Sequence, residues 1–316
     1  PNTVDPVVFR GADNRLWMTY GSYSGGIFIM ELDPNSGFPY PGQGYGKHLM
    51  GGNHSRIEAA YTIYAPETGY YYMFASYGGL SADGGYNIRV SRATSPDGPY
   101  YDASGTNMAD VKGAPGTIFD DASIAPHGVK LMGNYLFANS NNELGYVSPG
   151  HNSAYRKSDS GQYFVFFHTR FPNRGEEHEV RVHEFFLNEA GWPVVAPLCY
   201  AEKVDGSNAG RTRDQLEAVY ASEIPGTYQL INHGKDITAN IKGSSNIQLS
   251  AGGSISGAQS GSWVYNEVTR ATTVSLNGTS YQGVVSKQWN QVRNRYEVTF
   301  SALSADGTAV WGIKSN

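Results

Sequence analysis

The sequence predicts an all-β fold, and its composition, its turns and the pattern of its strands all indicate this. Charged residues make up only 16% of the 316 residues, whereas the chain contains 39 Gly and 23 Tyr. Glycine permits tight turns and tyrosine is favoured in strands, so this composition is typical of many short strands joined by turns. The net charge of -5 argues against nucleic acid or an anionic membrane as a partner.

The same order of elements recurs in three segments, which begin at Asp5, Glu58 and His151. In each, a polar residue opens a short strand, and a turn follows that reads "GADN", "PETG" or "SDSG". An aromatic strand comes next ("LWMTYGS", "YYYMFASY" or "YFVFFHT"), and then a third, alternating strand ("IFIMELD", "NIRVSRA" or "EVRVHEF"). Such repeated antiparallel meanders predict the blades of a β-propeller.

The polar residues that open the three segments form a candidate site. The innermost strand of each propeller blade lines a central channel, so Asp5, Glu58 and His151 would face that channel from equivalent positions. The alternative is that they only form turns before the strands, as acidic residues often do. The first interpretation predicts that three side chains far apart in sequence converge on one cavity.

The rest of the chain predicts a less regular region and a second domain. Residues 106–150 contain one strand pair, around "GVKLM" and "NYLFA", and otherwise read as loop. Beyond residue 222, short strands alternate with "AGG", "LNG" and "ADG" turns. We therefore expect a propeller domain at residues 1–222 and a small β-barrel or sandwich at residues 223–316. The single cysteine, Cys199, excludes an internal disulfide.

Two carboxylates that face one cavity are the minimum equipment for glycoside hydrolysis, in which one donates a proton and the other stays ionised. Glu58 lies among apolar and small residues in "RIEAAY", which suits the proton donor. Asp5 would supply the neighbouring negative charge that raises the pKa of such a donor. Aromatic residues in or near the same strands would either form walls for sugar rings or pack the blades; they are Trp17, Tyr20, Tyr23, Tyr61 and Tyr77.

Two further motifs have competing interpretations. Arg170 in "HTRFP" either binds a sugar hydroxyl or pairs with a surface acid. The stretch "HEVRVH" is similar to a zinc signature, but His178 and His183 are five residues apart and lie in an alternating strand pattern. Because the zinc motif needs two histidines four residues apart on a helix, we reject a zinc protease.

The stretches "VDPVVF", "SRIEAAYTIY" and "SPGHNSAY", together with the C-terminal strands, resemble the endo-α-1,5-L-arabinanases of glycoside hydrolase family 43, in their larger two-domain bacterial form. The resemblance implies a five-bladed propeller that is secreted and hydrolyses arabinan with inversion. It assigns Glu58 as the acid, Asp5 as the second aspartate that tunes the acid, and His151 as the ligand of a mostly water-coordinated Ca²⁺ ion on the propeller axis. Ser22 in "GSYSGG" is similar to a serine of the sugar subsite, and we group Tyr77 and Arg170 with it as substrate-binding candidates.

The family's catalytic base, an aspartate in the first blade, has no match in these residues. We therefore expect the 316 residues to be the C-terminal portion of a longer enzyme whose missing N-terminal segment completes the propeller and is its partner. This portion alone would be inactive towards arabinan. Two alternatives remain from the residues: an exo-acting arabinofuranosidase or xylosidase, and a non-catalytic propeller in which Asp5 and Glu58 only hydrogen-bond sugar.

Overall fold

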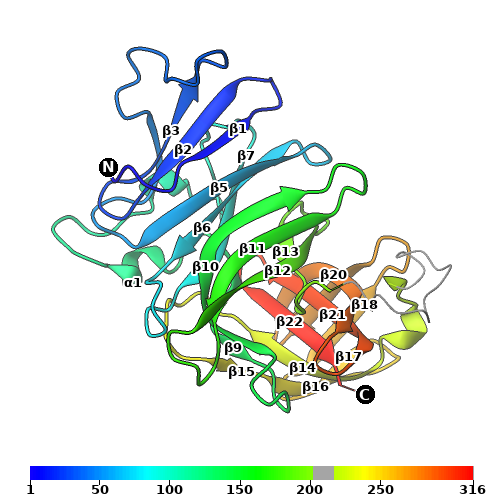
Figure 1. Cartoon of the computed structure of the whole chain (residues 1–316). Helices are drawn as coiled ribbons and strands as arrows, with labels where there is room; N and C mark the ends of the chain where they lie inside the picture. The colour runs from blue at the N-terminus through cyan, green and yellow to red at the C-terminus, as the bar shows by residue number, and fades with distance from the viewer. Residues whose placement is uncertain (202–216, 316) are drawn as a thin grey trace.

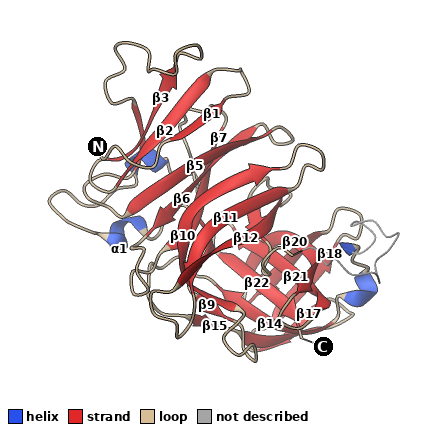
Figure 2. Ribbon diagram, in the orientation of Figure 1, coloured by secondary structure: helices blue, strands red, loops and turns tan. Residues whose placement is uncertain are grey.

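The computed structural model describes residues 1–201 and 217–315 and consists of three β-sheets and a closed β-barrel (Figure 1). Nearly all regular structure is strand (Figure 2), so the all-β prediction is confirmed. The short helices in the described residues are η1 (Met108–Asp110), α1 (Asp121–Ile124) and η3 (Ala221–Glu223). Within these described ranges, no helix has the length and apolar character needed to cross a membrane.

The first two sheets are antiparallel meanders of four strands in chain order, as the repeated segments predict. Asp5 precedes the first strand of the first sheet, Glu58 is the second residue of the first strand of the second sheet, and an aromatic strand follows in each. The first sheet contains β1 (Val7–Arg10), β2 (Leu16–Ser22), β3 (Gly26–Leu32) and β4 (Lys47–Met50). The second contains β5 (Ile57–Ala65), β6 (Tyr70–Tyr77), β7 (Asn87–Ala93) and β8 (Val129–Met132).

The third sheet has six strands and takes one of them from the C-terminal part of the chain. Its order is β13-β12-β11-β10-β9-β15, and β15 runs parallel to β9. The strand pair expected within residues 106–150 is wrong, because β8 pairs with β7 while β9 pairs with β10. The strands are β9 (Tyr135–Leu136), β10 (Gly145–Arg156), β11 (Tyr163–Arg170), β12 (His178–Leu187), β13 (Pro193–Val195) and β15 (Lys242–Gly243).

The barrel closes through eight strands, which decides between the barrel and the sandwich left open by the sequence. Its interior is filled by large apolar side chains such as Trp263, Tyr228 and Phe300. The predicted boundary at residues 222/223 falls between β13 and the first barrel strand. The barrel strands are β14 (Gly226–Asn232), β16 (Ser245–Leu249), β17 (Ser254–Gly257), β18 (Gly261–Tyr265), β19 (Ala271–Leu276), β20 (Thr279–Asn290), β21 (Arg295–Ser304) and β22 (Ala309–Lys314).

Continuous apolar cores join these units. One core lies between the first and second sheets and includes Trp17, Ile27 and Met73. A larger core joins the second sheet, the third sheet and one side of the barrel, and there the ring of Tyr135 contacts Trp311 at 5.2 Å between centroids. Figure 1 shows the same order in space, with the barrel next to the third sheet.

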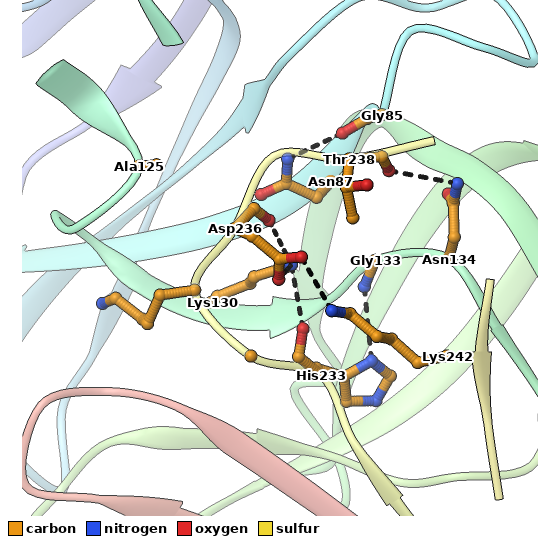
Figure 3. Close-up of polar contacts among 12 residues, drawn as sticks. Gly85, Asn87, Ala125, Lys130, Gly133, Asn134, His233, Asp236, Thr238 and Lys242 are labelled. Carbon is orange, nitrogen blue, oxygen red and sulfur yellow. Dashed lines mark hydrogen bonds and ion pairs between the residues drawn. The ribbon is translucent and has the colours of Figure 1, made fainter. Parts of the chain in front are cut away.

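Polar contacts add to this junction where the connection between β14 and β15 crosses the second sheet (Figure 3). The Lys130 side chain is 3% exposed, and its Nζ donates hydrogen bonds to the carbonyl oxygens of His233 (2.9 Å) and Asp236 (2.6 Å). Burial lowers the pKa of Lys130 to about 7. Asn134 Nδ2 donates to Ala239 O at 3.0 Å. Since buried polar groups need partners, these bonds fix the position of the barrel relative to the second sheet.

Candidate active site

A cavity of about 280 Å³ lies between the starts of β1 and β5 and the middle of β10. Each sheet contributes three consecutive residues to its lining. They are Asp5, Pro6 and Val7 from the first sheet, Ala59, Ala60 and Tyr61 from the second, and His151, Asn152 and Ser153 from the third. The three sheets therefore meet at one central space, to which the first two sheets present residues at the start of β1 and β5 and the third presents residues from the middle of β10.

The backbone has the same unusual conformation at one residue of each of these three segments. Asp5, Ala59 and His151 have φ values of 53°, 54° and 50°, in the left-handed region that residues other than glycine rarely adopt. The register of β5 against β6 shifts between Glu58 and Tyr61, and that of β10 against β11 shifts on both sides of Gly150. Such bulges redirect a side chain at the end of a strand.

The shared conformation corrects one detail of the sequence interpretation. The residue equivalent to Asp5 and His151 is Ala59, whereas Glu58 comes one residue earlier in its segment. Asp5, Ala59 and His151 all line the cavity, whereas Glu58 is not among its lining residues. Of the three side chains predicted to converge on one cavity, those of Asp5 and His151 therefore meet there, and Glu58 immediately precedes a lining residue in sequence.

Asp5 connects the first strands of the three sheets. Its Oδ2 accepts a hydrogen bond from the amide of Ala59 at 3.2 Å, and its Oδ1 lies 3.8 Å from His151 Nε2. The structure thus brings Asp5, His151 and the peptide that follows Glu58 into contact. The His151 side chain is 50% exposed, so its ring is open to solvent or to a ligand.

The carboxyl group of Glu58 is held at both oxygens. Ser22 Oγ donates to Oε2 at 2.9 Å, and the hydroxyl of Tyr86 donates to Oε1 at 2.7 Å. Tyr86 is fully buried, and burial together with the adjacent carboxyl group raises its pKa well above the ordinary value. The hydroxyl therefore stays protonated at neutral pH and remains a donor to Glu58.

A row of aromatic rings supports Tyr86. Its ring stacks with His168 at 6.0 Å between centroids, and His168 stacks in turn with His151 at 6.1 Å. Burial and the positive charge of Arg170 lower the pKa of His168 to about 4, so this ring is neutral at neutral pH. Sequence reasoning missed Tyr86 and His168, because one tyrosine in "GGYNIRV" and one histidine in "FFHTRF" carry no distinguishing pattern.

Comparisons with known proteins identify the family. Residues 1–193 match the profile described as glycosyl hydrolases family 43, and residues 207–312 match a C-terminal lipocalin-like domain associated with it. The chain belongs to glycosyl hydrolase family 43. The second match agrees with the closed eight-stranded barrel.

Two curated proteins are similar over nearly the whole chain. An extracellular endo-α-(1→5)-L-arabinanase 2 of Bacillus subtilis is 56% identical over 315 residues, which are 99% of this chain and 65% of the relative. An extracellular endo-α-(1→5)-L-arabinanase of Thermotoga petrophila is 48% identical over 320 residues, covering 99% of this chain and 64% of the relative. The chain thus spans slightly less than two thirds of the length of these two relatives.

Solved structures of family 43 proteins have the same fold. The glycoside hydrolase YxiA of Bacillus licheniformis superposes with a TM-score of 0.92 at 56% identity, over 99% of this chain and 68% of that one. An endo-1,5-α-L-arabinanase of Thermotoga petrophila gives a TM-score of 0.90 at 47% identity, over 100% of this chain and 68% of that one.

Two of the residues predicted to bind substrate lie differently in this family 43 chain. Tyr77 is 1% exposed, and the guanidinium of Arg89 lies 4.6 Å from its ring centroid. A ring buried in this way presents no face to a sugar, so the structure places Tyr77 in the core, which is the packing alternative. The Arg170 side chain is 5% exposed and forms an ion pair with Glu176, as in the acid-pairing alternative.

Proposed function

We propose that this chain carries the general acid and the tuning aspartate of a secreted endo-acting arabinanase, which cleaves α-1,5-linked arabinan with inversion. The observation that supports this most directly is the carboxyl group of Glu58, which Ser22 and Tyr86 hold at both oxygens beside Asp5. The two similar curated proteins are named extracellular endo-arabinanases, which supports both the substrate and secretion. The three sheets would be three blades of a five-bladed propeller.

The geometry suggests different roles for the carboxyl groups of Glu58 and Asp5. Glu58 would donate its proton to the leaving glycosidic oxygen, and its two hydrogen bonds keep the carboxyl group oriented during that transfer. Asp5 would orient the site, since it accepts a hydrogen bond from the Ala59 amide and faces His151. An inverting enzyme also needs a base that activates water, roughly 6.5–9.5 Å from the acid. We propose that this base belongs to a part of the protein outside these residues.

The described residues around His151 do not by themselves form a complete site for the calcium ion that the family resemblance implies. Across residues 1–201 and 217–315, no group of three His, Cys, Asp or Glu side chains could hold a metal ion. Calcium prefers six to eight oxygen ligands, so protein atoms alone do not fit it here. One imidazole is compatible only with an ion whose other ligands are mainly water. We retain this ion as a proposal, and derive no catalytic step from it.

The proposed function is tested by assaying the protein at its full natural length on debranched linear arabinan. We expect arabino-oligosaccharides of mixed length as the first products, because endo action cuts within the polymer. Proton NMR during the first minutes should show the β-anomer of the new reducing end, as inversion of the α-linkage requires. Arabinose as the only early product would indicate an exo enzyme, and binding of arabinan without any cleavage would indicate a carbohydrate-binding protein.

Removal of divalent cations tests the role of His151. We expect chelation of the full-length protein to lower kcat on arabinan roughly 10- to 100-fold, with recovery when Ca²⁺ is added. His151→Ala should give a similarly low kcat that Ca²⁺ does not restore. Thermal unfolding serves as the control, because loss of activity through unfolding would lower Tm in parallel. Full activity after chelation, with no bound metal found by elemental analysis, would refute the calcium proposal.

A further inference from the structure

Phe119 is an exposed aromatic residue in a strained backbone conformation. Its side chain is 51% exposed and its φ is 59°, in the left-handed region that a bulky residue adopts only at a cost of about 1–3 kcal/mol. The amide of Phe119 donates to His54 O at 3.1 Å, which helps to hold this conformation. Neighbouring Ile118 is 71% exposed, so the loop presents a small apolar surface to solvent.

The surroundings of the Phe119 ring leave one face open. The guanidinium carbon of Arg56 lies over the ring, 5.5 Å from its centroid, and Tyr23 meets it in an edge-to-face contact at 5.6 Å and 70°. Arg56 in turn pairs with Asp121, through Nε to Oδ1 at 3.0 Å. Because Arg56 lies over one face and Tyr23 meets the ring edge-to-face, we take the opposite face of the ring as the one available to a ligand.

The two residues that contact Phe119 are close in sequence to Glu58 or to its hydrogen-bond partner Ser22. Tyr23 follows Ser22, whose hydroxyl donates to Glu58, and Arg56 lies two residues before Glu58 on the approach to β5. Tyr23 is fixed by a hydrogen bond from its hydroxyl to Gly78 O at 2.7 Å. Burial, followed by the negative charge of Glu58, raises the pKa of Tyr23.

We propose that the open face of Phe119 is a stacking platform for a furanose ring of the substrate, in a subsite adjacent to the one at Glu58. Sugars bind proteins by placing a C–H face on an aromatic ring, and a rigidly held ring loses little entropy when it does so. Arg56 is neutralised by Asp121, so the platform suits an uncharged sugar such as arabinofuranose and not an acidic one. This inference rests on the proposed function.

The substitution Phe119→Asn tests the platform with little disturbance of the backbone. Asparagine tolerates the left-handed conformation and keeps the amide that binds His54, but it removes the ring. We expect the KM for linear arabino-oligosaccharides to rise roughly three- to tenfold, with kcat and Tm nearly unchanged. Phe119→Tyr and Phe119→Trp should keep the KM of the original protein. The matched control is Phe38→Asn, which removes a ring 73% exposed on the connection between β3 and β4.

A binding experiment separates this inference from the proposed function. Titration calorimetry of the full-length Glu58→Gln protein with a linear α-1,5-arabino-oligosaccharide measures binding without turnover. If Glu58→Gln binds the oligosaccharide and the double variant with Phe119→Asn binds it equally well, the platform is refuted while the proposed function stands. If Glu58→Gln binds no arabino-oligosaccharide and the unaltered protein cleaves none, the proposed function itself fails. Weaker binding by the double variant alone supports the platform.

Discussion

Replacement of Glu58 by glutamine is expected to lower kcat on arabinan roughly 100- to 10,000-fold, because the side chain no longer has a proton to donate. Glutamine has the same shape, and its amide oxygen can still accept from the Tyr86 hydroxyl, which now donates to Glu58 at 2.7 Å. The amide nitrogen can donate to Ser22 Oγ. We therefore expect KM to change by less than threefold. Steady-state kinetics of the full-length protein would measure both parameters.

A substrate with a good leaving group shows whether the lost function is proton donation. Nitrophenolate needs little protonation to depart, so Glu58→Gln should lose much less activity on a nitrophenyl arabinofuranoside than on arabinan. The matched control is Glu67→Gln, because Glu67 also accepts a hydrogen bond from a tyrosine hydroxyl, that of Tyr163 at 2.6 Å. Glu67→Gln should retain kcat. An equal loss on both substrates would contradict the acid role of Glu58.

The fold could be predicted from sequence wherever a local pattern determines it. Period-two alternation correctly predicts β12 from "HEVRVH", and the Gly- and Asp-containing turns mark the meanders. Local patterns of this kind do not show which distant strands pair with each other. The two-residue strands β9 and β15 meet only because the barrel packs against the third sheet, and no periodicity can appear in two residues. The same limit explains the wrong strand pair within residues 106–150.

In the candidate site, too, local motifs could be predicted from the sequence, whereas the facing of side chains could not. Asp5, Glu58 and His151 could be found because each belongs to a recognisable motif, "VDPVVF", "RIEAAY" or "SPGHNSAY". Tyr77 was predicted to bind substrate, but it lies on the opposite face of β6 from its neighbour Ser76. Its neighbour Ser76 accepts a hydrogen bond from the amide of His151 at 2.8 Å, whereas Tyr77 points to the other face of β6, into the core. Strand register decides which neighbour faces the cavity, and the sequence does not state the register.

Replacement of Gly150 by alanine is expected to disable the site through Tyr86. An added Cβ would overlap the Cδ1 and Cε1 atoms of the Tyr86 ring, which is buried and stacked on His168. The ring has to move, and its hydroxyl then leaves Glu58. Overpacking of this kind costs roughly 1–3 kcal/mol of stability. Because Glu58 then loses one of the two hydrogen bonds that orient it, kcat should fall about tenfold. Thermal unfolding and steady-state kinetics measure the two effects separately.

Two further variants distinguish positioning of the acid from general destabilisation. Tyr86→Phe keeps the ring and removes only the hydroxyl, so kcat should fall about tenfold with a small change in Tm. Gly312→Ala is the matched control, since its Cβ would overlap the Phe300 ring inside the barrel. It should lower Tm as Gly150→Ala does while leaving kcat intact. If Gly150→Ala also keeps its kcat, then Tyr86 fills space in the core and does not position Glu58.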